Sequence, residues 1–303
     1  MNVLITGGAG YIGFSLVAEL LKIEAVDKIT VYDNMLSSSN QFFLYKFINS
    51  QKLKFVAGDI LNNKSLANQL KGIDIVYHLA AKVSEPESDL DSHYFEQTNH
   101  WGTSILVDAL EVTKPKKVIY VSSIYVYGHH DGIINDQTPT SPNSFYGISK
   151  LRGEEQMSRL QNISDLYIFR VANVFGINPC IRIDLLINKL IFESHFNHKI
   201  NIFGDGSQIR AFIEVKSLAK LLIKPVTEDL GNGIRNLVEI NMSLNDICVE
   251  LTRIYPKLQY FYVNRHMRMN DINVEVPGFI GKNKRETLSK FRNDILSIKT
   301  ALL

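Results

Sequence analysis

The sequence predicts an α/β fold: a doubly wound parallel sheet with helices on both faces and a smaller, discontinuous C-terminal substrate-binding domain. Short apolar runs alternate with helical patterns as far as Val171, which is typical of parallel strands joined by helices. After Gly176 this alternation weakens. With 303 residues, 45% of them hydrophobic and 21% charged, the chain can bury a large core.

Six segments are predicted as strands of this sheet. They are Asn2–Ile5, Lys28–Tyr32, Leu53–Ala57, Asp74–His78, Lys117–Ser122 and Leu166–Val171. Between the strands, residues such as Ile12, Leu16 and Leu20 recur at the spacing of one helix face. Ligands of such sheets bind beyond the carboxyl ends of the strands, so side chains at those ends are candidates for a site.

A glycine-rich turn follows the first strand, with Gly7, Gly10 and Gly13 leading into a helical pattern. Such a turn lets the backbone approach a pyrophosphate, which the start of the helix then attracts. Asp33 ends the next strand, about 20 residues further on, where a carboxylate accepts hydrogen bonds from both ribose hydroxyls. The same carboxylate repels a 2′-phosphate. The pattern therefore predicts a Rossmann-type NAD site; an ordinary tight loop explains the glycines alone but not the strand, helix and acid together.

The domain boundaries are predicted from the change of pattern. Residues 1–176 form the NAD-binding domain, to which residues 212–254 return, and residues 177–211 and 255–303 form the cap. Within the second half, a helix is predicted over Arg182–Phe196, and a strand-turn-strand unit over Asn201–Phe203, Gly204–Gly206 and Ile209–Val215.

Charge and cysteine content exclude several function classes. Lysine and arginine total 33 against 31 acidic residues, a net charge of +2, so neither nucleic acid nor a membrane is an expected partner. No secretory leader and no stretch of transmembrane length is seen. Cys180 and Cys248 lack metal-ligand spacing and are expected to be free, buried thiols of a cytoplasmic protein.

Tyr146 and Lys150 are the strongest candidates for chemistry. Residues four apart share one face of a helix, and a nearby ammonium lowers the pKa of a tyrosine. Such a tyrosine can take the proton of an alcohol while hydride leaves the same carbon. Ser123 ends the fifth strand and could hydrogen-bond the reacting oxygen. A solvated helix pair and a serine that only forms a turn are the alternatives for these residues.

Three other segments contain residues that could suggest a binding site but are expected to have only structural roles. His129, His130 and Asp131 follow a strand in a glycine-containing loop without a third ligand at suitable spacing, so no metal site is predicted. Trp101 and the aromatic stretch 41–47 are expected in the core or at a dimer surface rather than in stacking on bases.

Together these motifs resemble the extended short-chain dehydrogenases/reductases of the NAD-dependent nucleotide-sugar epimerase/dehydratase family. The resemblance covers residues 1 to about 250 and is nearest to UDP-glucose/galactose 4-epimerase-like members. Its motifs are the turn 6–13, Val31–Asn34, Gly58–Ile60, His78–Ala81, Thr98–Thr103, Ser122–Gly128, the pair Tyr146 and Lys150, Arg170–Gly176 and Gly204–Arg210.

The resemblance implies roles for individual residues. Ser123, Tyr146 and Lys150 are the implied catalytic residues. The implied cofactor-binding residues are Gly7, Gly10, Tyr11, Ile12, Gly13, Asp33, Asn34, Asp59, Ile60, Leu79, Ala80, Ala81, Asn99, Ser122, Tyr146, Lys150 and Val171. The implied substrate-binding residues are Ser84, Ser123, Asn173 and Arg210, of which Asn173 and Arg210 hold the diphosphate.

The chain departs from the family pattern at several positions. Ala211 replaces the usual aspartate before Phe212, and Lys216 and Ser217 replace an acidic pair, which puts the hinge and the substrate pocket in doubt. From about Tyr255 onward no family pattern matches. Dehydratases of the family place Asp-Glu after the catalytic serine, where this chain has Ile124 and Tyr125. The resemblance therefore favours a 4-epimerase over a 4,6-dehydratase.

The expected reaction is epimerisation of a nucleotide-diphosphate sugar by transient oxidation at C4 and return of the hydride to the other face. Two alternatives remain open: a nucleotide-sugar dehydrogenase or reductase that releases its redox product, and a non-catalytic NAD-binding protein. Relatives commonly dimerise through helices around residues 94–112 and 145–160, so a homodimer is expected. The sugar and the nucleotide are not predicted.

Overall fold

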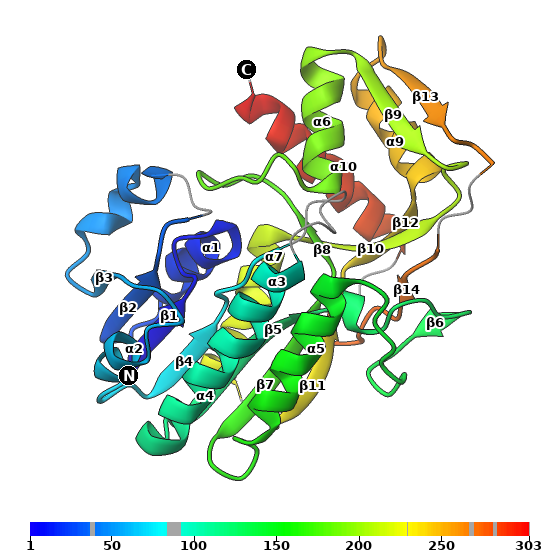
Figure 1. The fold of residues 1–303 in the computed structure, drawn as a ribbon. Coiled ribbons are helices and arrows are strands. Elements are labelled where there is room, and N and C mark those ends of the chain that lie inside the picture. The colour runs from blue at the N-terminus through cyan, green and yellow to red at the C-terminus, as the bar shows by residue number, and fades with distance from the viewer. Residues whose placement is uncertain (37–39, 84–91, 229, 267–269, 281–283, 303) are drawn as a thin grey trace.

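The molecule is built on a seven-stranded parallel sheet with the strand order β11-β7-β5-β4-β1-β2-β3 (Figure 1). The computed structural model describes residues 1–36, 40–83, 92–228, 230–266, 270–280 and 284–302. The strands are β1 Asn2–Thr6, β2 Lys28–Asp33, β3 Leu53–Ala57, β4 Ile75–His78, β5 Lys117–Ser123, β7 Asp165–Val171 and β11 Gly233–Leu237. Every neighbouring pair is parallel. The predicted α/β fold with a Rossmann-type sheet is confirmed.

The six predicted strands all lie in this sheet, with ends that differ from the predicted ends by at most one residue. Their continuous apolar character follows from burial on both faces, because alternate residues of a strand point to opposite sides. In β1, Val3 and Ile5 pack into one hydrophobic cluster and Leu4 packs into another. The seventh strand, β11, lies where the sequence predicted no strand.

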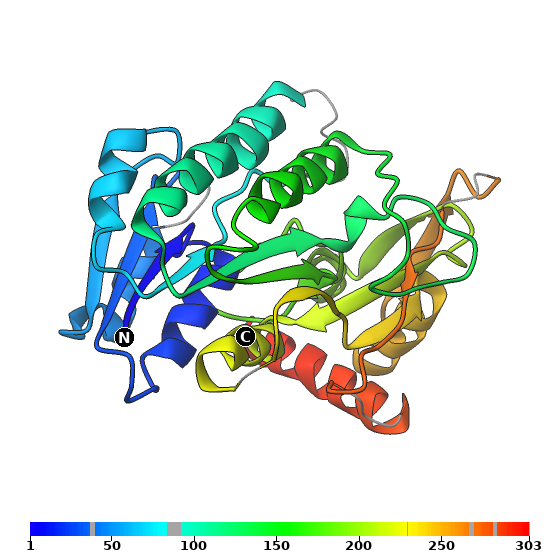
Figure 2. The ribbon, with the colours of Figure 1, turned by 90° about the horizontal axis from the view of Figure 1, so that it is seen from below.

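Helices cover both faces of the sheet (Figure 2). One face carries α1 Tyr11–Leu20, α7 Val215–Leu222 and the short α8 Lys224–Thr227. The other carries α2 Asn63–Gln69, α4 Gly102–Thr113 and α5 Phe145–Ser158. The turns α3 Ser92–Phe95 and η4 Glu96–Trp101, the latter π-helical, precede α4, and the short helices η1 Asn40–Leu44, η2 Lys46–Asn49 and η5 Ile124–Val126 lie in connections.

A second hydrophobic core lies in the cap, shown at the upper right of Figure 1. Its helices are α6 Leu186–Phe196, α9 Leu244–Ile254 and α10 Lys284–Ala301. Its sheets are β8 Asn173–Phe175 with β10 Ile209–Glu214 and β12 Ile240–Ser243, and β9 Lys199–Phe203 with β13 Gln259–Val263. A small pair, β6 Ile133–Ile134 with β14 Asn273–Val274, joins a loop of the first domain to the C-terminal part of the chain.

The second half of the chain divides differently from the predicted domains. Residues 233–237 return to the main sheet as β11, but Ile247 and Leu251 of α9 pack in the cap core. The physical reason is the apolar face of α9, which is buried against α6 and α10 side chains. The predicted helix over Arg182–Phe196 begins later, at Leu186, because Leu185 is still extended.

No helix among the described residues combines the length and the apolar character that crossing a membrane requires. Cys180 and Cys248 are both buried and form no disulfide with each other, as the sequence predicts.

Candidate active site

The glycine-rich turn joins the end of β1 to the start of α1. Gly7 has a φ of +71°, and a Cβ atom on it would lie 2.5 Å from the backbone nitrogen of Ala80. Only glycine fits, because the turn lies directly against the segment that leaves β4. Gly10 precedes α1 and supplies no side-chain cap, so the first amides of that helix keep their capacity to bind an anion.

Asp33 lies beside this turn at the end of β2. Its carboxylate accepts hydrogen bonds from the backbone amides of Ala9, at 3.0 Å, and Met35, at 2.8 Å. Burial raises the pKa of Asp33, and the two amide bonds oppose that rise. The neighbouring Asn34 amide donates to Asp59 at 2.9 Å. The structure thus brings together the three polar residues predicted to contact the adenosine part of the cofactor.

Other predicted cofactor residues lie at or just beyond the carboxyl ends of β3, β4, β5 and β7. Leu79 donates its amide to Thr6, so residues 79–81 continue from β4 beside the glycine turn. Ile60 is buried against α4, where it faces Gly102. Val171 pairs with Ser123 at the ends of β7 and β5. Ser84 lies outside the described residues.

Asn99 is buried in the π-helical turn η4, and both the oxygen and the nitrogen of its side-chain amide form hydrogen bonds within the protein. Its oxygen accepts from the Lys82 amide at 2.8 Å, and its nitrogen donates to the Lys82 carbonyl and to the Ser149 hydroxyl, each at 2.9 Å. Asn99 therefore fixes the segment after β4 to the helix that carries Tyr146. In this structure it acts as a positioning residue for the site.

The predicted catalytic residues come from two elements that pack together. Ser123 ends β5, and its hydroxyl hydrogen-bonds to the phenol of Tyr146 near the start of α5. One turn further along α5, the Lys150 ammonium is buried and lies 4.3 Å from the ring centroid of Tyr120. The spacing of four residues places both side chains on the face of α5 that covers the strand ends.

The protonation of these groups differs from the prediction. Burial raises the pKa of Tyr146 to about 12, against which the Ser123 hydrogen bond and the charge of Arg182 act in the lowering direction. Burial lowers the pKa of Lys150 to about 7, and the nearby Glu154 carboxylate opposes this. In the protein alone, burial therefore dominates the pKa of Tyr146, and the Lys150 ammonium lies over the ring of Tyr120. The predicted fall of the tyrosine pKa is not found in this state.

The resemblance implies that Ser122 binds the cofactor, but its side chain forms a hydrogen bond inside the protein. Its hydroxyl donates to Glu154 at 2.5 Å, and Glu154 also forms a buried ion pair with Arg170 at 2.7 Å. The Arg170 guanidinium in turn lies 4.7 Å from the ring centroid of Tyr127. Sequence reasoning missed this network, although Glu154 follows Lys150 by one helical turn. The network holds α5 against the ends of β5 and β7.

The two predicted diphosphate ligands are bonded within the chain. Asn173 accepts from the Tyr125 hydroxyl at 3.1 Å and donates to the Ala211 carbonyl at 3.1 Å. Arg210 donates to the carbonyls of Ile209, at 2.9 Å, and Asn270, at 2.5 Å. The Ala211 that departs from the family pattern is thus fully buried and offers its carbonyl to Asn173.

Tyr11 links the two halves of the molecule. Its hydroxyl donates to the Gly176 carbonyl at 2.7 Å, and burial raises its pKa. Asn178 donates to the Tyr11 carbonyl at 2.8 Å. Tyr11 was expected to contact the cofactor through the turn; its side chain also ties α1 to the entry of the cap.

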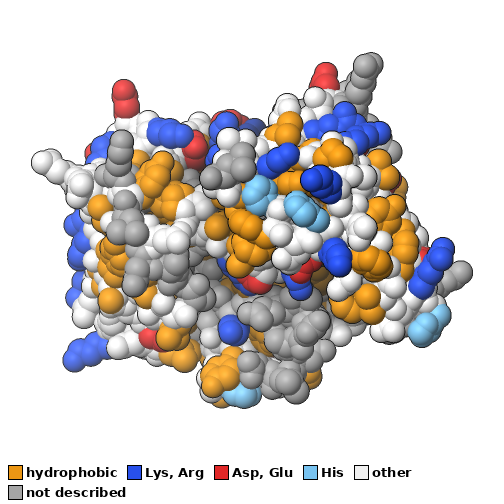
Figure 3. All heavy atoms as spheres, turned by 90° about the horizontal axis from the view of Figure 1, so that it is seen from above, with side chains coloured by type: hydrophobic (Ala, Val, Ile, Leu, Met, Phe, Trp, Pro, Cys, Tyr) orange, Lys and Arg blue, Asp and Glu red, His pale blue; other side chains and the backbone are white. Residues whose placement is uncertain are grey.

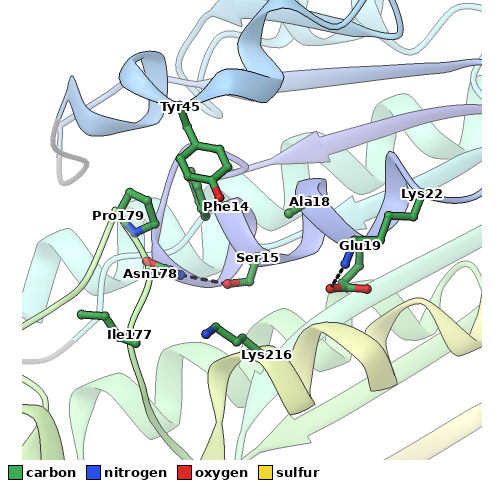
Figure 4. A pocket seen from close by; sticks show the side chains of 10 residues that line it. All are labelled: Phe14, Ser15, Ala18, Glu19, Lys22, Tyr45, Ile177, Asn178, Pro179 and Lys216. Atoms are coloured by element: carbon green, nitrogen blue, oxygen red, sulfur yellow. Dashed lines mark hydrogen bonds and ion pairs between the residues drawn. The ribbon is translucent and has the colours of Figure 1, made fainter. Parts of the chain in front are cut away.

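A cavity of about 540 Å³ lies beside α1, away from the catalytic residues (Figure 4). It is lined on one side by Ser15 and Ala18, and on the others by Tyr45, Pro179 and Lys216. The predicted site residues do not line it. Lys216, one of the residues that depart from the family pattern, is exposed at the start of α7. The N-terminal amides of α7 are capped by Glu214.

The histidine loop and the aromatic residues interpreted as structural differ in their surroundings. Among the described residues no group of side chains could hold a metal ion. His130 hydrogen-bonds to the Pro139 carbonyl at 2.9 Å. Phe42 is buried and packs edge-on against Phe14, whereas Trp101 is 54% exposed.

Comparison with known proteins decides the family. The family model described as the NAD dependent epimerase/dehydratase family matches residues 3–237. The chain belongs to this family. NAD is accordingly its cofactor.

Relatives within the family differ in activity. The chain is 30% identical over 239 residues to a Bacillus subtilis protein described as an uncharacterized UDP-glucose epimerase, covering 76% of this chain and 73% of that protein. It is 29% identical over 259 residues to the Homo sapiens dTDP-D-glucose 4,6-dehydratase, covering 84% and 73%. A UDP-N-acetylglucosamine 4-epimerase from Methanobrevibacter ruminantium M1, solved with UDP-N-acetylmuramic acid, superposes with a TM-score of 0.84 at 27% identity, over 99% and 97% of the two chains. The chain is thus an enzyme of the epimerase/dehydratase family.

The residues present fit NAD by their own chemistry. The Gly7 position admits no side chain, the start of α1 has no side-chain cap, and Asp33 supplies carboxylate oxygens beside the turn. Figure 3 shows the molecule from above, with basic and acidic side chains both present among hydrophobic and white atoms.

Proposed function

We propose that this protein is an NAD-dependent 4-epimerase of a nucleoside-diphosphate sugar. The observation that carries the proposal is the chemistry beside Tyr146. At the two positions after Ser123, where dehydratases carry an acid pair, Ile124 is buried in the core and Tyr125 bonds to Asn173. Elimination of water needs an acid and a base at neighbouring carbons, and these two side chains supply no carboxylate.

The proposed roles follow from the contacts. Gly7, Asp33 and the start of α1 would hold the dinucleotide, which when bound supplies a hydride acceptor and donor. Tyr146 takes the proton of the sugar hydroxyl and returns it later, while Ser123 holds the same oxygen. Lys150 would supply positive charge near the phenol and would help to hold the ribose of the bound dinucleotide. Asn173 and Arg210 anchor the diphosphate, so that remote binding energy holds the sugar while it turns over.

The experiment that tests this function is incubation of the purified protein with UDP-, dTDP-, GDP- and CDP-sugars without added nicotinamide. We expect a product of unchanged mass and inverted configuration at C4, with no net change in NADH absorbance. A product lighter by one water would replace the proposal by a dehydratase, the activity named for the human relative. Turnover that consumes one NAD or NADH for each product formed would replace it by a dehydrogenase or reductase.

We also propose that the protein is a cytoplasmic homodimer that packs through α4 and α5. Support comes from apolar side chains exposed on α4 and on the turn η4 that precedes it: Val112 of α4 is 81% exposed and Trp101 of η4 is 54% exposed. Covering such side chains in a second copy removes apolar area from water. Light scattering on the intact protein tests the proposal, and Val112→Glu should shift the mass from two chains toward one.

A further inference from the structure

Tyr125 is a second phenol in the active site, and neither the fold nor the catalytic roles described above require it. The residue follows Ser123 by two positions, in the short helix η5 between β5 and the next loop. Its side chain is half-buried, and its ring meets the ring of Tyr146 edge-on, with centroids 6.2 Å apart. It is therefore a direct neighbour of the proposed acid/base.

The approach of the two tyrosines is built into the backbone. Gly147 follows Tyr146, and a Cβ atom at position 147 would lie 2.5 Å from the Tyr125 carbonyl oxygen. Because any side chain at position 147 would push α5 away from η5, the glycine allows the close packing that brings the phenols together. The contact follows from how α5 is seated on the end of β5.

The other end of the Tyr125 side chain reaches the diphosphate ligands. Its hydroxyl donates to the Asn173 side-chain oxygen at 3.1 Å, and the positive charge of Arg210 acts on the phenol. Tyr125 thus spans the distance from Ser123 and Tyr146 on one side to Asn173 and Arg210 on the other. In a nucleoside-diphosphate sugar, the part between the reacting C4 hydroxyl and the diphosphate is the sugar ring.

We infer that Tyr125 is a substrate-binding residue that contacts the sugar ring. This inference rests on the proposed function. The phenol donates its hydrogen to Asn173, so its oxygen is left to accept a hydrogen bond from a sugar hydroxyl. Burial raises the pKa of Tyr125, which keeps the phenol protonated and able to donate to Asn173 at neutral pH. The aromatic ring offers an apolar face to the carbon skeleton of the sugar.

The test separates sugar binding from diphosphate binding. Calorimetry on the NAD-loaded protein measures the affinity for UDP-, dTDP-, GDP- and CDP-glucose, and for the nucleoside diphosphate of the tightest of them without the sugar. We expect Tyr125→Phe to weaken the sugar nucleotide about five- to tenfold, the value of one hydrogen bond. The nucleoside diphosphate should change less than about twofold.

Tyr127→Phe is the matched control, since it removes the same atom two residues further along the chain. The Tyr127 hydroxyl donates to Asn236 at 2.9 Å in the interior, so its loss should lower the unfolding temperature without changing the ratio of the two affinities. Unfolding temperatures of both variants show whether each is folded.

Two results would overturn the inference while leaving the proposed function intact. In the first, Tyr125→Phe binds the sugar nucleotide as tightly as the unmodified protein does. In the second, it weakens the sugar nucleotide and the nucleoside diphosphate equally, which would mean that Tyr125 acts on the diphosphate through Asn173. A wild-type protein that binds none of the four sugar nucleotides and none of the corresponding nucleoside diphosphates overturns the proposed function and this inference with it.

Discussion

The cofactor side and the substrate side of the active site are constructed differently. On the cofactor side, polar groups are held by the backbone at strand ends, as the amides of Ala9 and Met35 hold Asp33. On the substrate side, Asn173 and Arg210 bond to Tyr125 and to carbonyls of the chain itself. The first arrangement is pre-formed, whereas the proposed diphosphate binding would require Asn173 or Arg210 to exchange hydrogen-bond partners within the chain. We therefore expect cofactor residues to act on NAD alone and substrate residues to act on the sugar nucleotide alone.

Tyr146→Phe is the strongest test, because Tyr146 lies where the two sides meet. Removing the phenolic oxygen should lower kcat about 10³-fold, since acid–base catalysis supplies effects of this size. NAD content and sugar-nucleotide affinity should change much less than kcat, because the contacts of Asp33 on the cofactor side and of Asn173 and Arg210 on the substrate side do not involve that oxygen. Steady-state kinetics and calorimetry measure both. Unchanged turnover would show that Tyr146 is not the acid/base.

Lys150→Met tests the cost of burying a charge on the cofactor side. The pKa of Lys150 falls from about 10.5 to about 7 because of burial. Below about pH 7 the lysine is charged in both states and its burial destabilises the fold in full; the penalty disappears as the pH rises toward 10.5. In cofactor-free protein, the variant should therefore gain stability on the order of 3 kcal/mol at pH 6 and progressively less toward pH 10.

Thermal unfolding across this pH range measures the effect. Lys220→Met is the control, since Lys220 is exposed on α7. It should shift the unfolding temperature equally at all pH values. A Lys150→Met variant that behaves in the same way would contradict the role assigned to burial.

Arg210→Ala tests the substrate side. The loss of a charged ligand to the diphosphate should weaken sugar-nucleotide binding about 30-fold, or roughly 2 kcal/mol, and leave NAD binding unchanged. Arg253→Ala, which removes a half-exposed arginine from α9 of the same cap, should change neither affinity. A parallel loss of NAD would mean that the two sides are not independent.

Asp33→Asn should give the smallest effect, on the cofactor side. An amide keeps one hydrogen-bond acceptor but loses the negative charge, so NAD should bind about tenfold more weakly. The ratio of the affinities for NAD and NADP should become smaller, because the charge that repels a 2′-phosphate is gone. Asp74→Asn is the matched control: Asp74 also accepts a backbone amide, from Asn2 at 2.8 Å, but at the opposite end of the sheet. It should affect stability and not NAD affinity, which fluorescence titration measures.

Local pattern was sufficient for the first half of the molecule. Apolar runs bounded by turns located the six strands, and the glycine turn with Asp33 located the cofactor end, because neighbouring parallel strands end at the same edge. The local pattern was insufficient for α9, because its apolar face is compatible with packing in the core of the first domain or in the core of the cap. The packing of Ile247 and Leu251 against α6 and α10 decides in favour of the cap. The contacts of Ser122 could not be predicted either. Glu154 and Arg170 are distant from Ser122 in the sequence and come close to it only in the folded protein.

The sequence by itself determined the fold, the family and the residue types of the site, because these depend on periodicity and on short motifs that each lie within one turn or one helix. Tertiary structure alone decided the electrostatics. Burial, which no local pattern records, raises the pKa of Tyr146 and lowers that of Lys150. The tertiary structure also places Tyr125 between Tyr146 and Asn173. These residues lie on η5, α5 and β8, which are distant in the chain and are brought together by packing.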